Sequence, residues 1–266
     1  MNHERTVAAY ATWMGSWGAS PRTIEARSTF ARSRLREWSL TGFTAENIQE
    51  FLARDTADWT RLTYYNHLND LVAWLRATGA ITGDPMRMIR RPRQPEAEPW
   101  PLEPDEQKLV LSVARGPVLT MIMLGLYAGL RAHETAKFHG ADITKERIRV
   151  VGKGRKASIL PCMPELWEVA QTMPRDRYWF PGATEGQPMK PDTVSMHVGK
   201  LFRGLGIDGG YHRCRHTFAT NLVRNGVHAR AVQALMRHSQ LNTISIYTKM
   251  SDYQLREAIE TLRPGA

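Results

Sequence analysis

Residues 211–220 read YHRCRHTFAT. The pattern predicts a helix over about 213–225, with the first polar residues at its start. His212 and Arg215 stand three positions apart there, so their side chains point to the same side. The stretch therefore pairs an imidazole, which titrates near neutral pH, with a guanidinium that keeps its charge.

Two stretches on the N-terminal side carry further basic residues at the ends of predicted elements. Arg131 lies in GLYAGLRAHE, residues 125–134, where an apolar helix over about 117–129 gives way to a polar turn. Lys153 lies in the sequence GKGR, between β-rich runs at 147–151 and 156–160. Those runs predict a hairpin with the lysine in its loop.

On the C-terminal side, His238 follows in ALMRHSQ, and Tyr247 comes nine residues later in SIYTKM. We expect the other helices of this region at about 105–114, 164–172, 191–203, 228–236, 240–247 and 251–262.

In this order and spacing, the motifs resemble the tyrosine recombinase family, also called the phage integrase family. They comprise GLR-x-x-E, a hairpin lysine, H-x-x-R-H-T-F-A-T, a histidine after a short helix, and I-Y-T. The resemblance covers residues 105–262. It implies a site-specific recombinase that cleaves and religates DNA through a 3′-phosphotyrosine at Tyr247, without metal or cofactor.

The resemblance also assigns roles to the residues. Tyr247 would be the nucleophile, and Arg131 and Arg215 would clamp the two non-bridging phosphate oxygens. Glu134, three residues after Arg131, would orient that arginine.

Proton transfer falls to the remaining residues of the set. Lys153 would protonate the leaving 5′-oxygen, and His212 would assist proton transfer from the tyrosine. His238 would donate a hydrogen bond to the phosphate. His216 would have a structural role next to the catalytic side chains rather than a catalytic one.

The first ninety residues read as a helical bundle, similar to the family's core-binding domain. Amphipathic segments cover 3–17, about 21–38 after Ser20-Pro21, a third opening at Thr44, and about 60–78 before Gly79. The organisation expected is a DNA-binding domain at 1–90, a linker at 91–104 and a catalytic domain at 105–266. The fold class expected is mainly α with a small antiparallel sheet, shaped as a C-shaped clamp around DNA.

Charge fits a nucleic-acid partner. The net charge is +10, with a pI near 9.9. In and before the linker we expect DNA-backbone contacts from Arg87, Arg90, Arg91 and Arg93. The family implies four protomers at specific core sites on double-stranded DNA, and allows an accessory DNA-bending or directionality factor. We expect no export signal at the N-terminus and no segment that spans a membrane. Together with only two cysteines, this leads us to expect the chain in the bacterial cytoplasm or nucleoid, or in a phage-infected host.

Several alternatives stay open. Out of context, Tyr247 reads as a helix anchor, and Tyr253 lies nearby. His212 and His216 with Cys214 between them have a zinc-ligand spacing, but no second ligand pair appears. His133 and His228 read as surface residues.

Integration is the expected outcome of recombination, and the short two-domain type without an arm-binding domain fits it. A resolvase of the Xer or Cre kind, a transposon recombinase, a type IB topoisomerase and a non-catalytic regulator are the others.

Two positions depart from the family pattern. Arg237 stands where a glycine usually precedes the histidine found here at 238, so we expect an altered turn. Cys214 replaces a commoner leucine, which is a tolerable apolar change.

Overall fold

The computed structural model describes residues 3–95, 99–152 and 157–237. The chain divides into two compact units, Met1–Glu96 and Ala97–Ala266. Helices dominate both units, and the strands of the described residues form one two-stranded antiparallel sheet. This confirms the prediction of a mainly α fold with a small antiparallel sheet. No helix in this described part combines the length and the apolar character that a membrane crossing requires.

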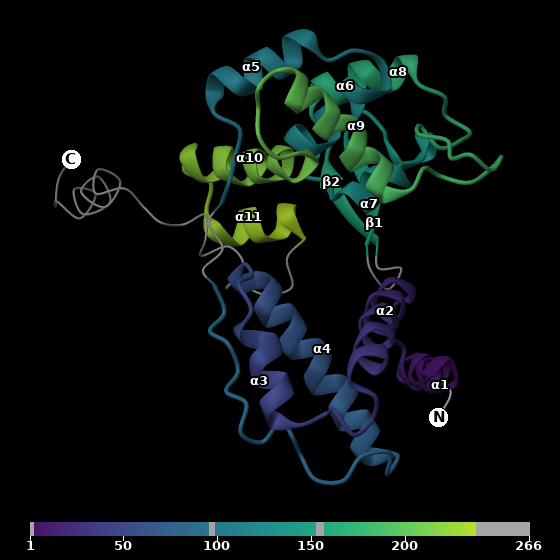
Figure 1. The fold of residues 1–266 in the computed structure, drawn as a ribbon. Coiled ribbons are helices and arrows are strands. Elements are labelled where there is room, and N and C mark those ends of the chain that lie inside the picture. Colours follow the sequence, from purple (N-terminus) through teal and green to yellow (C-terminus); the bar gives the residue numbers. More distant parts are fainter. Residues whose placement is uncertain (1–2, 96–98, 153–156, 238–266) are drawn as a thin grey trace, which may run out of the picture. The chain divides into compact units, whose positions relative to one another are not determined.

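Four helices build the first unit: α1 (His3–Ser16), α2 (Pro21–Trp38), α3 (Ala45–Ala53) and α4 (Asp58–Ala77) (Figure 1). Two starts follow from local capping, since the hydroxyls of Ser20 and Thr44 accept hydrogen bonds from main-chain N–H groups three residues on. Helix α4 begins two residues before the predicted start. Its N-cap, Ala57, makes no side-chain bond that the sequence could have announced.

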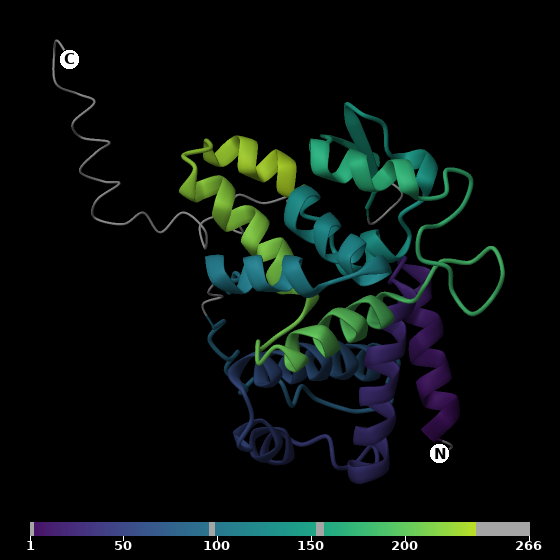
Figure 2. The same cartoon turned by 90° about the horizontal axis from the view of Figure 1, so that it is seen from above.

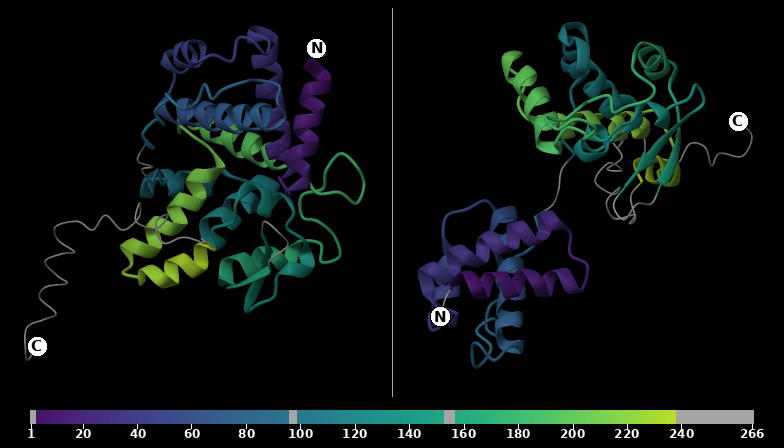
Figure 3. Two further views of the ribbon diagram at one scale, coloured as in Figure 1. Left: turned by 90° about the horizontal axis from the view of Figure 1, so that it is seen from below. Right: turned by 90° about the vertical axis from the view of Figure 1, so that its right-hand side faces the viewer.

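The core of the first unit lies between these helices. Helices α1 and α2 pack along each other, and α2 also contacts α4 (Figure 3). Tyr10, Leu35 and Leu71 are almost completely buried there. Met86 and Ile89 join the same core from the segment after α4, which fixes that segment to the unit.

The second unit contains the remaining elements. Its helices are α5 (Pro104–Val113), α6 (Gly116–Ala128), α7 (Ala132–Ala136), α8 (Pro164–Thr172), α9 (Pro191–Gly204), α10 (Tyr211–Arg224) and α11 (Ala229–Met236). A 3-10 turn, η1 (Gly140–Asp142), precedes strands β1 (Arg147–Val151) and β2 (Ala157–Pro161). The sequence misses α7, whose five residues are too few to show a helical period, and it places the start of α10 two residues late.

Helix α6 is the centre of this unit. Eight of its thirteen residues are buried, and it packs against α10, which in turn lies beside α11 (Figure 2). At the contact with α10, a Cβ on Gly125 would lie 2.7 Å from the Cβ of Cys214. The glycine therefore permits the close approach that brings α10 and the end of α6 together.

The start of the unit is fastened to α10 by Arg213. Its guanidinium donates to the carbonyl oxygens of Pro101 and Asp208, each at 2.7 Å, and pairs with Glu106 at 2.5 Å. It also lies over the ring of Trp100, 4.8 Å from the ring centre. The segment before α5 is thus part of the fold of the second unit.

The hairpin has the predicted antiparallel form. Arg147 pairs with Pro161 and Val151 with Ala157, so β2 ends one residue beyond the predicted run. Residues 152–156 connect the strands, and Lys153 lies outside the described residues.

Candidate active site

Arg131 is placed by the end of α6. The helix closes at Gly129, which has a left-handed backbone (φ 57°), and a Cβ there would lie 2.5 Å from the Phe218 ring. The chain then turns, and Arg131 becomes the residue before α7. Its side chain is about a third exposed (31%), so the guanidinium reaches solvent.

Glu134 holds Arg131 from two directions. Its carboxylate accepts the main-chain N–H of Arg131 at 2.8 Å and the guanidinium at 3.1 Å. The Glu134 side chain is only 1% exposed, so these bonds act in a place where water competes little.

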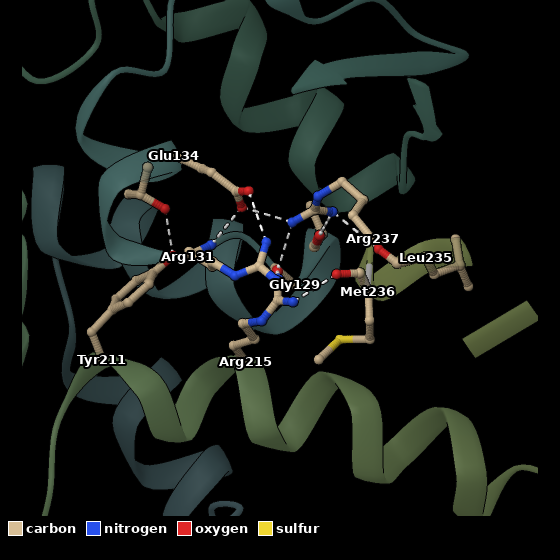
Figure 4. A network of polar contacts seen from close by, with 10 residues as sticks. Gly129, Arg131, Glu134, Tyr211, Arg215, Leu235, Met236 and Arg237 are labelled. Carbon is tan, nitrogen blue, oxygen red and sulfur yellow. Dashed lines mark hydrogen bonds and ion pairs between the residues drawn. The ribbon is translucent and has the colours of Figure 1, made fainter. Parts of the chain in front are cut away.

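Arg215 comes to the same place from α10, 84 positions further along the sequence (215−131=84). Its guanidinium donates to the carbonyl oxygen of Gly129 and, at 2.6 Å, to that of Met236 (Figure 4). These oxygens end α6 and α11, where the helix dipole favours a cation. Two helix ends therefore fix the direction of the Arg215 side chain.

Arg237 is a third arginine in the cluster, one that sequence reasoning noted but did not include in the site. Its backbone is left-handed (φ 53°, ψ 42°) and closes α11, so the arginine adopts the conformation that glycine adopts most easily. Its guanidinium pairs with Glu134 at 2.7 Å and donates to the carbonyl of Gly129 at 3.0 Å and of Leu235 at 3.0 Å. In the sequence, the single sign of this role is an arginine at a turn position where the family usually has a glycine.

The cluster carries excess positive charge. The guanidinium groups of Arg131 and Arg237 bind the carboxylate of Glu134, and the positive charge of Arg215 acts on it from nearby (Figure 4). Burial acts to raise the pKa of Glu134, but the positive charge of Arg237, the Arg131 N–H and both other arginines outweigh it and hold the pKa below its usual value. The carboxylate is therefore ionised, and the cluster keeps a net charge of about +2, which favours an anion.

The histidines of α10 lie within the field of these arginines. Desolvation, followed by the charges of Arg215 and Arg131, lowers the pKa of His212, which remains exposed. Burial and then His212 and Arg215 lower the pKa of His216 to about 4. Both imidazoles are thus neutral at physiological pH, and a neutral imidazole can accept a proton.

His133 is a correction to the sequence reading. It is partly buried, and its pKa is lowered by that burial and by nearby arginines, so it is not a plain surface histidine. His228 is exposed, as expected, and its Nδ1 accepts a hydrogen bond from the N–H of Arg230.

Of the six predicted catalytic residues, the structure brings Arg131, His212 and Arg215 together. Lys153, His238 and Tyr247 lie outside the described residues. Within the described ranges, no three His, Cys, Asp or Glu side chains gather in a way that could hold a metal ion.

Comparison with known proteins agrees with this geometry. The profile of the phage integrase family matches residues 102–254. The tyrosine recombinase XerA of Pyrococcus horikoshii is 31% identical, with 94% of this chain and 91% of XerA covered.

Two solved structures share the fold. The integrase from mycobacterium phage Brujita is 33% identical at a TM-score of 0.52, covering all of this chain and 94% of that one. The Tn1549 transposon integrase, solved in complex with circular intermediate DNA, is 18% identical at a TM-score of 0.71, covering 97% of this chain and 99% of that one. With a clustered arginine pair, a family profile over more than half its length and a full-length relative above 30% identity, the chain belongs to the phage integrase family and is a site-specific tyrosine recombinase.

Proposed function

We propose that Arg131 and Arg215 hold the scissile phosphate of a DNA strand while Tyr247 attacks its phosphorus. The observation that carries this is that the two arginines come from separate stretches of sequence to one place, where Glu134 holds the Arg131 guanidinium and two helix ends hold that of Arg215. Charge-assisted bonds from guanidinium groups suit the non-bridging oxygens, whose negative charge grows in the transition state.

The chemistry balances without an external energy source. The phenolic oxygen of Tyr247 forms a bond to phosphorus as the bond to the 5′-oxygen breaks. The phenolic proton passes towards His212, and Lys153 supplies a proton to the departing 5′-oxygen. The 3′-phosphotyrosine keeps the energy of the phosphodiester. A 5′-hydroxyl of another strand can therefore attack it, release the tyrosine and complete the exchange.

His238 would add a hydrogen bond to the same phosphate. Glu134 supports the proposal indirectly, because it keeps the Arg131 guanidinium in place through two bonds. His216, which is half-buried and within the electrostatic reach of His212, would act by packing and charge rather than by contact with DNA.

The partner we propose is double-stranded DNA. The Tn1549 integrase, which has the same fold, was solved with DNA. In the first unit, Met86 and Ile89 are buried while Arg87, Arg90, Arg91 and Arg93 are exposed. The last three line a groove of about 940 Å³ beside α3 and α4. We propose that these arginines contact the DNA backbone, which would make binding strongly dependent on salt.

We further propose that four protomers act together and that the outcome is integration. Exchange between two duplexes requires four cleavages, one for each protomer. The 33% identity to a phage integrase over the whole chain supports integration. The similarity to XerA supports resolution as the second candidate. An accessory bending or directionality factor is compatible with either outcome.

The test is covalent trapping on nicked duplexes with a randomised binding arm. The nick lets the short 5′ fragment diffuse away after cleavage, so the covalent complex accumulates and runs slowly on a denaturing gel. We expect an adduct with EDTA present, and none with Tyr247→Phe. Tyr253→Phe is the matched control and should retain the adduct. Adduct formation by Tyr247→Phe would refute the assignment of the nucleophile.

Sequencing the trapped DNA then gives the site and allows the outcomes to be separated. Two plasmids carrying recovered sites report integration, and one plasmid carrying two directly repeated sites reports resolution. Relaxation of a supercoiled plasmid without paired sites would instead indicate a topoisomerase.

A further inference from the structure

Arg237 occupies a position that costs backbone energy, and its side chain has partners that explain why an arginine is found there. In the described residues, only Ser39 and Arg237 have a positive φ without being glycine. Side chains with a Cβ avoid this region because the Cβ crowds the following carbonyl. The strain is offset by four contacts of the guanidinium, three to carbonyl oxygens at helix ends and one to Glu134.

These contacts make a bridge rather than a ligand site. The Arg237 side chain is 7% exposed, and its two terminal nitrogens donate to Ala128, Gly129 and Leu235 as well as to Glu134. It therefore lies behind the surface that a phosphate would reach. By contrast, Arg131 is 31% exposed and shares the same carboxylate.

Glu134 binds two guanidinium groups, each through a different oxygen of its carboxylate. Arg237 binds Oε2 at 2.7 Å, and the Arg131 guanidinium binds Oε1 at 3.1 Å. With Arg237 in place, part of the negative charge of the carboxylate is neutralised from the buried side. Without it, that charge would act on the remaining guanidinium groups, above all on that of Arg131, and would compete with a phosphate for it.

We propose that Arg237 is a positioning residue for DNA cleavage, which sets the charge of Glu134 and fastens the end of α11 to the end of α6, so that Arg131 and Arg215 are held ready for the phosphate. The inference rests on the proposed roles of those two arginines. It predicts that the guanidinium at 237 serves cleavage as well as stability, since the backbone at this turn alone would favour a glycine.

The experiment compares Arg237→Gly, Arg237→Lys and Glu134→Gln/Arg237→Gly with the wild-type full chain. The probe is one nicked duplex recovered by covalent trapping, and three quantities are measured: the thermal midpoint, the DNA dissociation constant, and the single-turnover rate of adduct formation at saturating protein. Ser39→Gly, in the first unit, is the control for glycine at a helix end with a positive φ.

For Arg237→Gly we expect DNA binding within about threefold of wild type, and a cleavage rate lower by on the order of tenfold to a hundredfold, since small misplacements of positioning groups cost that much. Removing the carboxylate charge in Glu134→Gln/Arg237→Gly should restore part of the rate, because nothing then competes for Arg131. Arg237→Lys should be intermediate, since an ammonium can pair with Glu134 but cannot bridge both helix ends. Ser39→Gly should cleave at the wild-type rate.

The outcomes separate the two proposals. If the wild-type protein forms no adduct, the proposed function fails. If the wild type forms it and Arg237→Gly cleaves as fast, the positioning role alone is refuted. A double variant slower than Arg237→Gly would also refute it, since a merely structural residue predicts a further loss rather than recovery. If Arg237→Gly does not fold, Arg237→Lys decides, and a wild-type rate there would overturn the proposal.

Discussion

Glu134→Ala should destabilise the second unit strongly, because it removes one buried carboxylate from two guanidinium groups. The side chains of Glu134 and Arg237 are 1% and 7% exposed, so water cannot replace the lost partner of Arg237 easily. Breaking a buried ion pair costs about 3–5 kcal/mol. Arg237 keeps its carbonyl partners and Arg131 is partly exposed, which places the expected loss at the lower end, about 3 kcal/mol.

For a unit of this size, about 3 kcal/mol corresponds to a decrease of the thermal midpoint of about 6–12 °C. Calorimetry of the full chain measures it, with the affected transition assigned to the second unit. Glu134→Gln should lose about 1.5–2 kcal/mol, because the amide oxygen can still accept the Arg131 N–H while the charge is gone. The control is Lys108→Ala, which removes an exposed pair with Asp105 and should change stability by less than about 0.5 kcal/mol. A loss below about 1 kcal/mol in Glu134→Ala would refute the view that this carboxylate is a buried anchor.

Three further outcomes follow from the same structure. The pKa of Glu134 is lowered from 4.5 in the folded state, so the stabilisation that its charge gives is complete above pH 4.5 and is lost as the pH falls through the folded pKa. When the free energy of unfolding is plotted against pH, the acid branch should therefore be flatter for Glu134→Gln than for the wild type. Parallel acid branches for the two proteins would contradict this. Arg131→Lys should bind DNA but form the covalent adduct slower by on the order of a hundredfold, because an ammonium cannot donate as a planar fork; near-normal cleavage would remove Arg131 from the phosphate site. Gly125→Ala should destabilise by about 1–3 kcal/mol in thermal unfolding, because its Cβ would meet the Cys214 Cβ at 2.7 Å, whereas Gly204→Ala has open space and should not lower the midpoint; equal midpoints for the two would refute the close approach of α6 and α10.

Local signals account for the parts of the fold that the sequence predicts well. Ser20 with Pro21, and Thr44, are N-cap signals that act within one turn, and both helices start there. The two β-rich runs on either side of GKGR predicted the hairpin, and the alternating burial of β1 agrees with it. Helix α7 was missed because its five residues give no periodic pattern.

The site is predictable only in part, because its contacts join distant residues. Arg131 and Arg215 follow from motifs, and the structure brings them together. The pairing of Glu134 with Arg237 spans 103 positions, and no local pattern encodes it. A basic residue at a turn usually faces water, so the residue type could not predict that the Arg237 side chain is buried. The predicted roles of Lys153, His238 and Tyr247 stay predictions, since these residues lie outside the described ranges.

The attachment of Arg213 to the segment before α5 has a practical consequence for chimeric recombinases. Its bond to Pro101 and its stacking on Trp100 make this short segment a structural component of the second unit rather than a tether. A graft that exchanges the N-terminal half should therefore keep the native residues from Trp100 onward. A junction placed at the start of α5 would replace Trp100 and Pro101. The buried guanidinium of Arg213, on the helix that carries His212 and Arg215, would then lose its aromatic partner and keep only Glu106 and Asp208 as native partners.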